Sequence, residues 1–278
     1  MVAKIFSIPQ LLEKKANGHK ITMLTAHDYP TAYLAAESGV DLILVGDSLG
    51  MTILGYSTPV PVTLTEMIHH TKAVVRGAGN VFVVADMPYG SCQMGTERAL
   101  ADAIALIKEG GARAVKIEGG EEIIPIVKEL TLRGIPVVAH IGVLPQTAHL
   151  WEGYTAQGLD ENDARELAVV AQDLEEAGAF AIVLECIAQE AAKLITEKLD
   201  IITIGIGSGS SCDGQLLVSE DMLGLSIGDK QKFNRKFTDL QAAIRQAFAQ
   251  YIKEVREGTF PTSAHAFEME EDEAQKIY

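Results

Sequence analysis

The sequence predicts an α/β protein folded as a (β/α)8 TIM barrel, and three observations lead to this fold class. Eight short aliphatic runs alternate with longer amphipathic segments that carry most of the charges. A chain of 278 residues is long enough for one barrel of this kind. Aromatic residues make up 6% of the chain against 47% for all hydrophobic residues, so the core is aliphatic, as in parallel strands buried on both faces.

The aliphatic runs are expected to be the barrel strands, because each is too short for a core helix. Alternation of strand and helix makes the strands parallel and the crossovers right-handed. The runs span residues 21–27, 41–47, 81–86, 114–118, 136–141, 181–185, 201–206 and 215–218. A Rossmann-type sheet would need Gly-x-Gly-x-x-Gly after the first strand, and the chain instead reads Thr25-Ala-His-Asp-Tyr-Pro30 there.

Amphipathic segments between the strands predict the helices that cover the barrel. They span residues 63–76, 95–109, 121–133, 161–177 and 189–198, and a further long helix is expected at 238–257. Glycine follows four of these segments, where a left-handed C-terminal cap would suit it. The four expected caps are Gly77, Gly110, Gly134 and Gly178.

We expect residues 1–265 to form a single catalytic barrel domain with an N-terminal helical extension. Residues 266–278 are expected to form an acidic, mobile C-terminal tail, because the chain from Glu268 onward is rich in acids and has a single lysine. The tail contributes to a formal net charge of −15 for the whole chain.

Charge and cysteine content exclude several function classes. A net charge of −15 disfavours nucleic acid and anionic membrane surfaces as partners. The cysteines, Cys92, Cys186 and Cys212, are odd in number and widely spaced, which fits neither a disulfide framework nor a thiolate zinc site. No apolar run is long enough to span a bilayer. We therefore expect a cytoplasmic protein with reduced thiols.

Polar residues terminate neighbouring strands of the predicted barrel. They are Asp47, Asp86, Glu118 and Glu185, and Lys116 lies two residues before Glu118 on the same strand, while His140 lies at the end of the fifth strand. The carboxyl ends of barrel strands meet at one face, which is where barrel enzymes carry their active sites. A single acid at a strand end is commonly the N-cap of the next helix, but so many carboxylates together with a lysine and a histidine favour a site.

The acids predict a metal-assisted reaction. Asp47, Asp86 and Glu118 offer hard oxygen ligands, which suit Mg²⁺ or a similar divalent ion. Such an ion would chelate a 2-oxo acid and stabilise its enolate. Lys116 would pair with substrate charge, and the alternatives are an ion pair with Glu118 or another acid, or Schiff-base chemistry. Glu185 ends an apolar strand, where removal from water suits a carboxylate that acts as a general base. A supporting carboxylate or a helix cap is the alternative.

The histidines and two loops allow more than one interpretation. His140 could transfer a proton or donate a hydrogen bond, and a hydrogen-bonded core histidine is the alternative. His69 and His70 are interpreted as structural. The loop 149–154 holds the single tryptophan and could be a lid, an apolar platform or a surface loop. The glycine-rich stretch 204–209 is interpreted as a tight turn rather than a phosphate site.

Several ordered motifs make the chain resemble one enzyme family over residues 21–263. Those motifs include Met23-Leu-Thr-Ala-His-Asp28, Gly46-Asp-Ser-Leu-Gly-Met51, Val84-Ala-Asp-Met-Pro88, Lys116-Ile-Glu-Gly-Gly120 and Ala139-His-Ile-Gly142. In them the sequence resembles the ketopantoate hydroxymethyltransferases. The resemblance implies transfer of a hydroxymethyl group from 5,10-methylenetetrahydrofolate to 3-methyl-2-oxobutanoate, which gives 2-dehydropantoate for pantothenate and coenzyme A. It also implies a cytoplasmic homodecamer of two pentamers.

The resemblance implies roles for individual residues. Asp47 and Asp86 match metal-binding aspartates that also face the substrate, and Glu118 matches a third carboxylate at the ion. Ser48 and Lys116 match groups that bind the carboxylate of the 2-oxo acid. Glu185 matches the proton acceptor, and His140 is assigned to the substrate-binding set with them. This chain departs from the family at the glycine-rich turn, where it carries Ser208 and the family commonly has alanine.

Two other functions compete with this one. A different metal–enolate barrel, such as an isocitrate-lyase-like C–C lyase or a phosphoenolpyruvate mutase, would share the strand-end carboxylates. The chain lacks the Lys-Lys-Cys-Gly-His type of cysteine motif that those lyases use. A barrel that has lost catalysis would serve as a binding or scaffold subunit, and the intact set of acids with Lys116 disfavours it.

Overall fold

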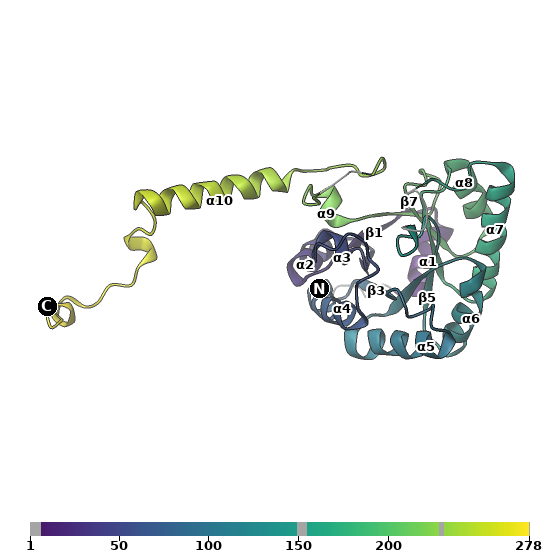
Figure 1. Ribbon diagram of the computed structural model, residues 1–278, viewed down its shortest axis with the longest axis horizontal. Coiled ribbons are helices and arrows are strands. Elements are labelled where there is room, and N and C mark those ends of the chain that lie inside the picture. Colours follow the sequence, from purple (N-terminus) through teal and green to yellow (C-terminus); the bar gives the residue numbers. More distant parts are fainter. Residues whose placement is uncertain (1–6, 149–154, 228–230, 278) are drawn as a thin grey trace.

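The computed structural model describes residues 7–148, 155–227 and 231–277. Its strands form a closed parallel barrel in the order β1 to β8, and β8 returns to pair with β1 through the register Ile21↔Gly214 (Figure 1). The predicted (β/α)8 fold class is therefore confirmed. The strands are β1 Ile21–Thr25, β2 Leu42–Val45, β3 Phe82–Asp86, β4 Ala114–Glu118, β5 Val137–Gly142, β6 Ala181–Glu185, β7 Ile202–Ile206 and β8 Gly214–Leu217.

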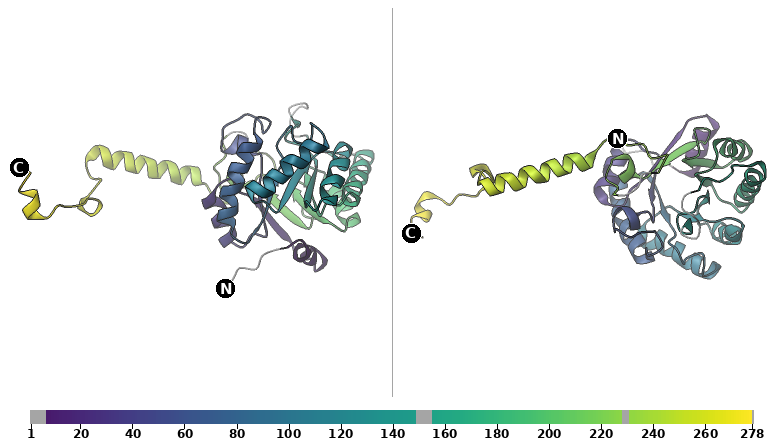
Figure 2. Two further views of the ribbon diagram at one scale, coloured as in Figure 1. Left: turned by 90° about the horizontal axis from the view of Figure 1, so that it is seen from below. Right: turned by 45° about the horizontal axis from the view of Figure 1, so that its top comes forward.

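Helices and helical turns connect the strands and surround them (Figure 2). Among the described residues they are α1 Ile8–Ala16, α2 Tyr29–Glu37, α3 Leu49–Thr52, α4 Leu64–Ala78, α5 Thr96–Ala105, the π-helical turn η1 Leu106–Gly110, the 3-10 turn η2 Glu121–Ile123, α6 Ile124–Leu132, α7 Glu161–Glu176, α8 Gln189–Lys198, α9 Ser219–Met222, α10 Leu240–Glu257, the 3-10 turn η4 Ser263–His265 and α11 Glu271–Ala274. Helix α8 has the bounds that the sequence predicts, and the other predicted helices differ by a few residues at their ends.

Two of the predicted glycine caps are wrong. Gly77 lies inside α4, where a Cβ would come within 2.3 Å of the Tyr29 carbonyl oxygen, so this glycine serves the close approach of α2. Gly79, with a φ of 58°, ends α4 instead. Gly110 similarly belongs to η1, which ends at Gly111 in the left-handed region. The caps predicted at Gly134 and Gly178 have positive φ angles of 78° and 101°.

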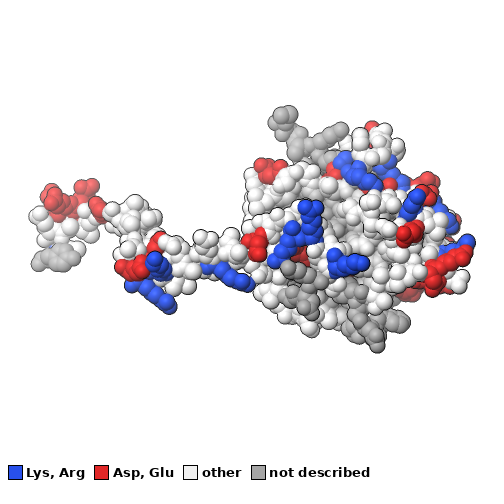
Figure 3. All heavy atoms as spheres, turned by 90° about the horizontal axis from the view of Figure 1, so that it is seen from above, with Lys and Arg blue, Asp and Glu red and all other residues white. Residues whose placement is uncertain are grey.

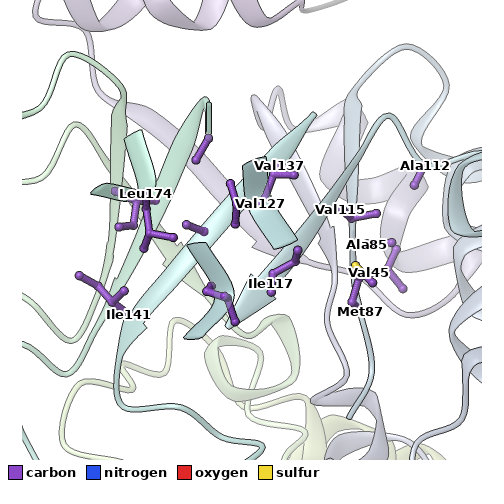
Figure 4. Packing of buried hydrophobic residues seen from close by; sticks show 14 of the residues in the cluster. Val45, Ala85, Met87, Ala112, Val115, Ile117, Val127, Val137, Ile141 and Leu174 are labelled. Carbon is purple, nitrogen blue, oxygen red and sulfur yellow. The ribbon is translucent and has the colours of Figure 1, made fainter. Parts of the chain in front are cut away.

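The aliphatic core has two layers separated by the barrel wall. One cluster fills the barrel interior, and the other, part of which Figure 4 shows, packs between the strands and the helices. Strand β4 shows how alternation divides its residues: Val115 and Ile117 join the outer cluster, whereas Lys116 and Glu118 lie on the opposite, inward side. The strand that helps build the core therefore also delivers two charged side chains to the barrel interior.

Helix α1 closes the N-terminal end of the barrel, which we call the barrel floor. There Lys14 pairs with Asp41, and Lys15 Nζ lies 3.0 Å from Asp213 Oδ2. Lys15 Nζ also donates to the Leu199 carbonyl oxygen at 2.8 Å. The floor is thus held by lysines that each have an acidic partner. The opposite end, where the strands terminate in Asp47, Asp86, Glu118 and Glu185, is called the barrel mouth.

Helix α10 projects away from the barrel (Figures 1 and 2). None of its residues is buried, and its apolar side chains recur at helical spacing along one exposed stripe. The stripe comprises Ile244, Phe248, Tyr251, Ile252 and Val255. The predicted barrel domain of residues 1–265 includes this helix. In the structure, α10 lies outside the barrel.

The end of the chain beyond α10 is acidic, and its acids cluster at the far end of the projection (Figure 3). Residues 266–277 are exposed apart from one half-buried position. Within the described parts of the chain, no helix has the length and apolar character needed to cross a membrane.

Candidate active site

A pocket opens at the barrel mouth. All seven residues that the sequence singles out as a site line it, namely Asp47, Ser48, Asp86, Lys116, Glu118, His140 and Glu185. Strand register explains two of the contacts between them, because Asp86 of β3 is paired with Lys116 of β4, and Glu118 of β4 with His140 of β5. The barrel thus brings together side chains that are far apart in sequence.

Lys116 is the buried cation of this group. Its Nζ lies 2.8 Å from Asp86 Oδ1 and 3.3 Å from His140 Nδ1. Burial alone would lower the pKa of the ammonium group, but the carboxylates of Asp86, Glu118 and Asp47 outweigh burial and raise it. Lys116 therefore remains charged, which suits binding of an anion and disfavours the Schiff-base alternative, since that chemistry needs a neutral amine.

Asp47 and Glu118 are acids whose buried positions disfavour the ionised form of the carboxyl group. Burial, followed by repulsion from Asp86, raises the pKa of Asp47 to about 7. Burial, followed by repulsion from Asp47, raises the pKa of Glu118 well above its usual range. Lys116 opposes both shifts without cancelling them. Without a further cation, these two acids therefore retain protons at a higher pH than ordinary carboxyl groups do.

Gln146 joins these two acids and is a residue that the sequence analysis did not assign to the site. Its side-chain Nε2 donates to Asp47 Oδ2 at 2.8 Å, and its backbone N–H donates to Glu118 Oε1 at 2.7 Å. The Gln146 amide also donates to the Met87 carbonyl oxygen at 3.0 Å. Gln146 follows β5 in a loop, where no strand or helix periodicity marks it as inward-facing.

His140 connects Lys116 to Glu185. Because an ammonium group can only donate, the contact with Lys116 makes His140 Nδ1 the acceptor and leaves the hydrogen on Nε2. His140 Nε2 lies 3.2 Å from Glu185 Oε2. Burial, followed by the nearby Lys116 charge, lowers the pKa of His140, so the ring is neutral. The Nε2 atom of this neutral ring is buried next to the Glu185 carboxylate and has no well-aligned hydrogen-bond partner among the described residues.

Ser48 occupies the N-cap position of α3 at the edge of the pocket. Its Oγ is buried and has no hydrogen-bond partner among the residues that the structure describes. The Asp47 backbone N–H next to it donates to Asp86 Oδ2 at 3.1 Å. A buried hydroxyl without a partner is available to a ligand in the pocket.

The predicted metal ligands face the same pocket without forming a ready-made cage. Across the described parts of the chain, no three His, Cys, Asp or Glu side chains are grouped closely enough to hold an ion. Asp86 is engaged by Lys116, and Gln146 bridges Asp47 and Glu118. The donor set nevertheless fits a hard divalent cation, because its carboxyl oxygens are buried together and a bound cation would replace the protons that these acids otherwise retain. The metal site itself stays a prediction.

The remaining sequence hypotheses lie away from this cluster. His70 Nδ1 contacts the His27 carbonyl oxygen at 2.6 Å, as expected of a structural histidine. The loop 149–154, which contains Trp151, lies outside the described residues. The glycine-rich turn follows β7 and includes the buried Ser208, with Gly207 in the left-handed region.

Comparison with known proteins decides the family. A family model described as Ketopantoate hydroxymethyltransferase matches residues 6–263. The chain belongs to the ketopantoate hydroxymethyltransferase family. Two relatives, both named 3-methyl-2-oxobutanoate hydroxymethyltransferase, come from Clostridium novyi (strain NT) and Carboxydothermus hydrogenoformans. The first is 52% identical over 95% of this chain and 96% of its own length, and the second is 49% identical over 98% and 99%. The resemblance inferred from the motifs, and with it the enzyme class, is confirmed.

Solved structures with the same fold include members of the competing enzyme group. Phosphonopyruvate hydrolase, solved with oxalate and Mg²⁺, has a TM-score of 0.59 at 14% identity and covers 98% of each chain. A 2,3-dimethylmalate lyase of the PEP mutase/isocitrate lyase superfamily has a TM-score of 0.57 at 17% identity and covers 97% of this chain and 96% of its own. At such identities the likeness shows the fold alone, whereas the family match assigns this chain to the hydroxymethyltransferases.

Proposed function

We propose that the protein catalyses the Mg²⁺-dependent transfer of a hydroxymethyl group from 5,10-methylenetetrahydrofolate to 3-methyl-2-oxobutanoate, which gives 2-dehydropantoate. The observation that carries this proposal is the buried group of acids and one charged lysine at the barrel mouth, in a chain of the ketopantoate hydroxymethyltransferase family. A small anionic 2-oxo acid and a proton-abstracting carboxylate fit that group.

A divalent ion would be held by Asp47, Asp86 and Glu118, whose negative charge it would neutralise. When bound, the ion would supply Lewis-acid stabilisation of the negative charge that develops on the keto oxygen of the substrate. Lys116 binds the substrate carboxylate, because it is charged and buried in the pocket. Ser48 Oγ donates to the same carboxylate, which is consistent with its lack of a partner in the described structure.

Glu185 is proposed as the general base. Its carboxylate lines the pocket, and its Oε2 lies 3.2 Å from His140 Nε2. Glu185 removes the proton from C3 of 3-methyl-2-oxobutanoate, and the resulting enolate carbon forms the new C–C bond to the one-carbon unit of the folate. Water supplies the oxygen of the transferred hydroxymethyl group. Both C–N bonds between the one-carbon unit and the folate break, and tetrahydrofolate leaves after its two nitrogens take up the proton from C3 and one proton from water.

The outer part of the pocket is proposed to bind the reduced folate. It is lined by Met51, Ile227 and Phe233, and the exposure of Met51 and Ile227 puts this part near solvent, above the buried acids. Asp221 also lines the pocket, and its Oδ2 accepts a hydrogen bond from Asn234 Nδ2 at 2.7 Å. Its carboxylate matches the two parallel N–H donors that the aminopyrimidine edge of a pterin presents.

We further propose that the protein is a cytoplasmic homo-oligomer, a decamer of two pentamers, as the family resemblance implies. The exposed apolar stripe of α10 supports association, because five large apolar side chains exposed on one helix face are typical of a surface that another protein chain covers.

The function is tested by assaying 3-methyl-2-oxobutanoate with and without 5,10-methylenetetrahydrofolate, in the presence and absence of Mg²⁺. We expect 2-dehydropantoate only when both the folate and the ion are present. Cleavage of a C–C bond in the absence of folate would indicate a lyase. Binding of the 2-oxo acid without any product would indicate a barrel that has lost catalysis.

A further inference from the structure

A tight turn follows β5 at the barrel mouth. The Thr147 backbone N–H donates to the Leu144 carbonyl oxygen at 3.0 Å, which closes a turn of four residues. Pro145 is the second residue of this turn, a position that suits its fixed φ, and Gln146 is the third. The local sequence therefore gives Gln146 a defined backbone position next to the pocket.

The start of this loop is anchored to β6. The Val143 backbone N–H donates to the Glu185 carbonyl oxygen at 2.9 Å. Gly142, which has a φ of 97°, permits this approach, because a Cβ there would lie 2.2 Å from the same carbonyl oxygen. The chain thus leaves β5 in a fixed direction, and Gln146 is buried at the end of it.

The side-chain amide of Gln146 uses both of its hydrogens. Its Nε2 donates to Asp47 Oδ2 at 2.8 Å and to the Met87 carbonyl oxygen at 3.0 Å. A carbonyl oxygen can only accept, so the contact with Met87 determines which end of the amide faces the two acceptors. A rotated amide would bring its own oxygen against them. The Gln146 side chain therefore holds one oxygen of Asp47 in a fixed orientation.

The Gln146 backbone holds a second acid. Its N–H donates to Glu118 Oε1 at 2.7 Å. Asp47 follows β2 and Glu118 ends β4, so this one residue contacts carboxyl groups from two strands that β3 separates. A hydrogen bond to one oxygen of a carboxylate orients the group and leaves its other oxygen for a ligand.

We propose that Gln146 is a positioning residue that orients the Asp47 and Glu118 carboxylates as ligands of the divalent ion. This inference rests on the proposed function, because the ion is part of that function. The two nitrogens that contact the acids are donors only, and Gln146 is not among the described residues that line the pocket. Gln146 therefore acts through the acids. Partners that orient metal ligands in this way typically change metal affinity by about tenfold to a hundredfold.

The test is Gln146→Met in the full-length protein, measured as Mg²⁺ binding by calorimetry without 2-oxo acid or folate. Methionine has a similar length and no hydrogen-bond donor, while the backbone N–H that contacts Glu118 remains. We expect the Kd for Mg²⁺ to rise about tenfold, because the Asp47 carboxylate is no longer held in one orientation. The free energy of unfolding is measured in parallel in the presence of a chelator.

Thr203→Val at the barrel floor is the matched control. Thr203 is fully buried, and its Oγ1 donates to Asp213 Oδ2 at 3.0 Å and contacts Thr196 Oγ1 at 2.9 Å. Like Gln146→Met, this substitution removes a buried side-chain donor to an aspartate. It should therefore reduce stability to a similar degree and leave the Kd for Mg²⁺ unchanged.

Gln146→Asn is a second variant in case Gln146→Met does not fold. It keeps the amide but is one methylene shorter, so it cannot reach both acceptors, and we expect a similar rise in the Kd. Wild-type Mg²⁺ affinity in the folded Gln146 variants, together with a loss of stability like that of Thr203→Val, would mean that the side chain is only structural and would overturn the proposal. A wild-type protein that binds no Mg²⁺ would overturn the metal dependence in the proposed function, and this inference with it.

Discussion

At the barrel floor, lysines and acids are matched in pairs, whereas at the barrel mouth one buried lysine faces several acids. Lys15 Nζ lies 3.0 Å from Asp213 Oδ2 at the floor, and Lys14 pairs with Asp41. At the mouth, the pKa of Asp47 is raised to about 7, and that of Glu118 is also raised. Matched charges hold a fold together, while unmatched buried charges of one sign are retained where a ligand will meet them.

The largest expected effect comes from removing charge at the mouth. Asp47→Asn should lower turnover at least about a thousandfold and abolish its response to Mg²⁺, because an ion ligand is lost. In the metal-free protein the same change should raise the free energy of unfolding by about 1 kcal/mol, since it removes a buried charge that Asp86 repels. Urea unfolding in the presence of a chelator and steady-state kinetics measure the two effects. A variant that retains Mg²⁺-stimulated turnover would refute the metal assignment.

A substitution at the barrel floor should lower the stability of the protein and leave its turnover unchanged. Lys15→Met should lower the free energy of unfolding by about 2 kcal/mol, because Asp213 and the Leu199 carbonyl oxygen lose a largely buried partner. Turnover per folded molecule should remain unchanged. Lys193→Met is the matched control, since the Lys193–Glu197 pair is exposed and worth at most a few tenths of a kcal/mol. A loss of turnover in folded Lys15→Met would mean that the two ends do not divide stability and function in this way.

A smaller effect distinguishes the outer pocket from the buried acids beneath it. Asp221→Asn should raise the KM for 5,10-methylenetetrahydrofolate about tenfold, because one of two carboxylate contacts to the pterin edge becomes unfavourable. Deuterium exchange at C3 without folate should proceed at the wild-type rate. Equal losses in exchange and in folate-dependent turnover would instead assign Asp221 to the 2-oxo acid side of the pocket.

Much of the fold and of the site is predictable because it depends on repeating patterns. The alternation along β4 separates Val115 and Ile117 from Lys116 and Glu118, and it is visible in the sequence as an apolar–polar period of two. The strand ends at Asp47 and Asp86 follow from the same reasoning, since every barrel strand points its carboxyl end to one face.

Features that depend on non-periodic contacts are not predictable in this way. Gln146 reaches Asp47 from a loop 99 residues away, and nothing in the local sequence marks its direction. Gly77 has the sequence context of a helix cap, but the crossing of α2 over α4 decides its role. The stripe on α10 predicts a packed helix face, but an amphipathic pattern does not say which surface covers it.

The measurement that tests the account most directly is C3 hydrogen exchange by Glu185→Gln in the absence of folate. Glutamine keeps the size of the side chain and removes its basicity, so the exchange kcat should fall by about a thousandfold, within the range expected for loss of a general base. Binding of Mg²⁺, followed by calorimetry, should be unchanged, because Glu185 is not among the proposed ligands. Exchange at the wild-type rate in Glu185→Gln would contradict the account, since the proton would then leave C3 by another route.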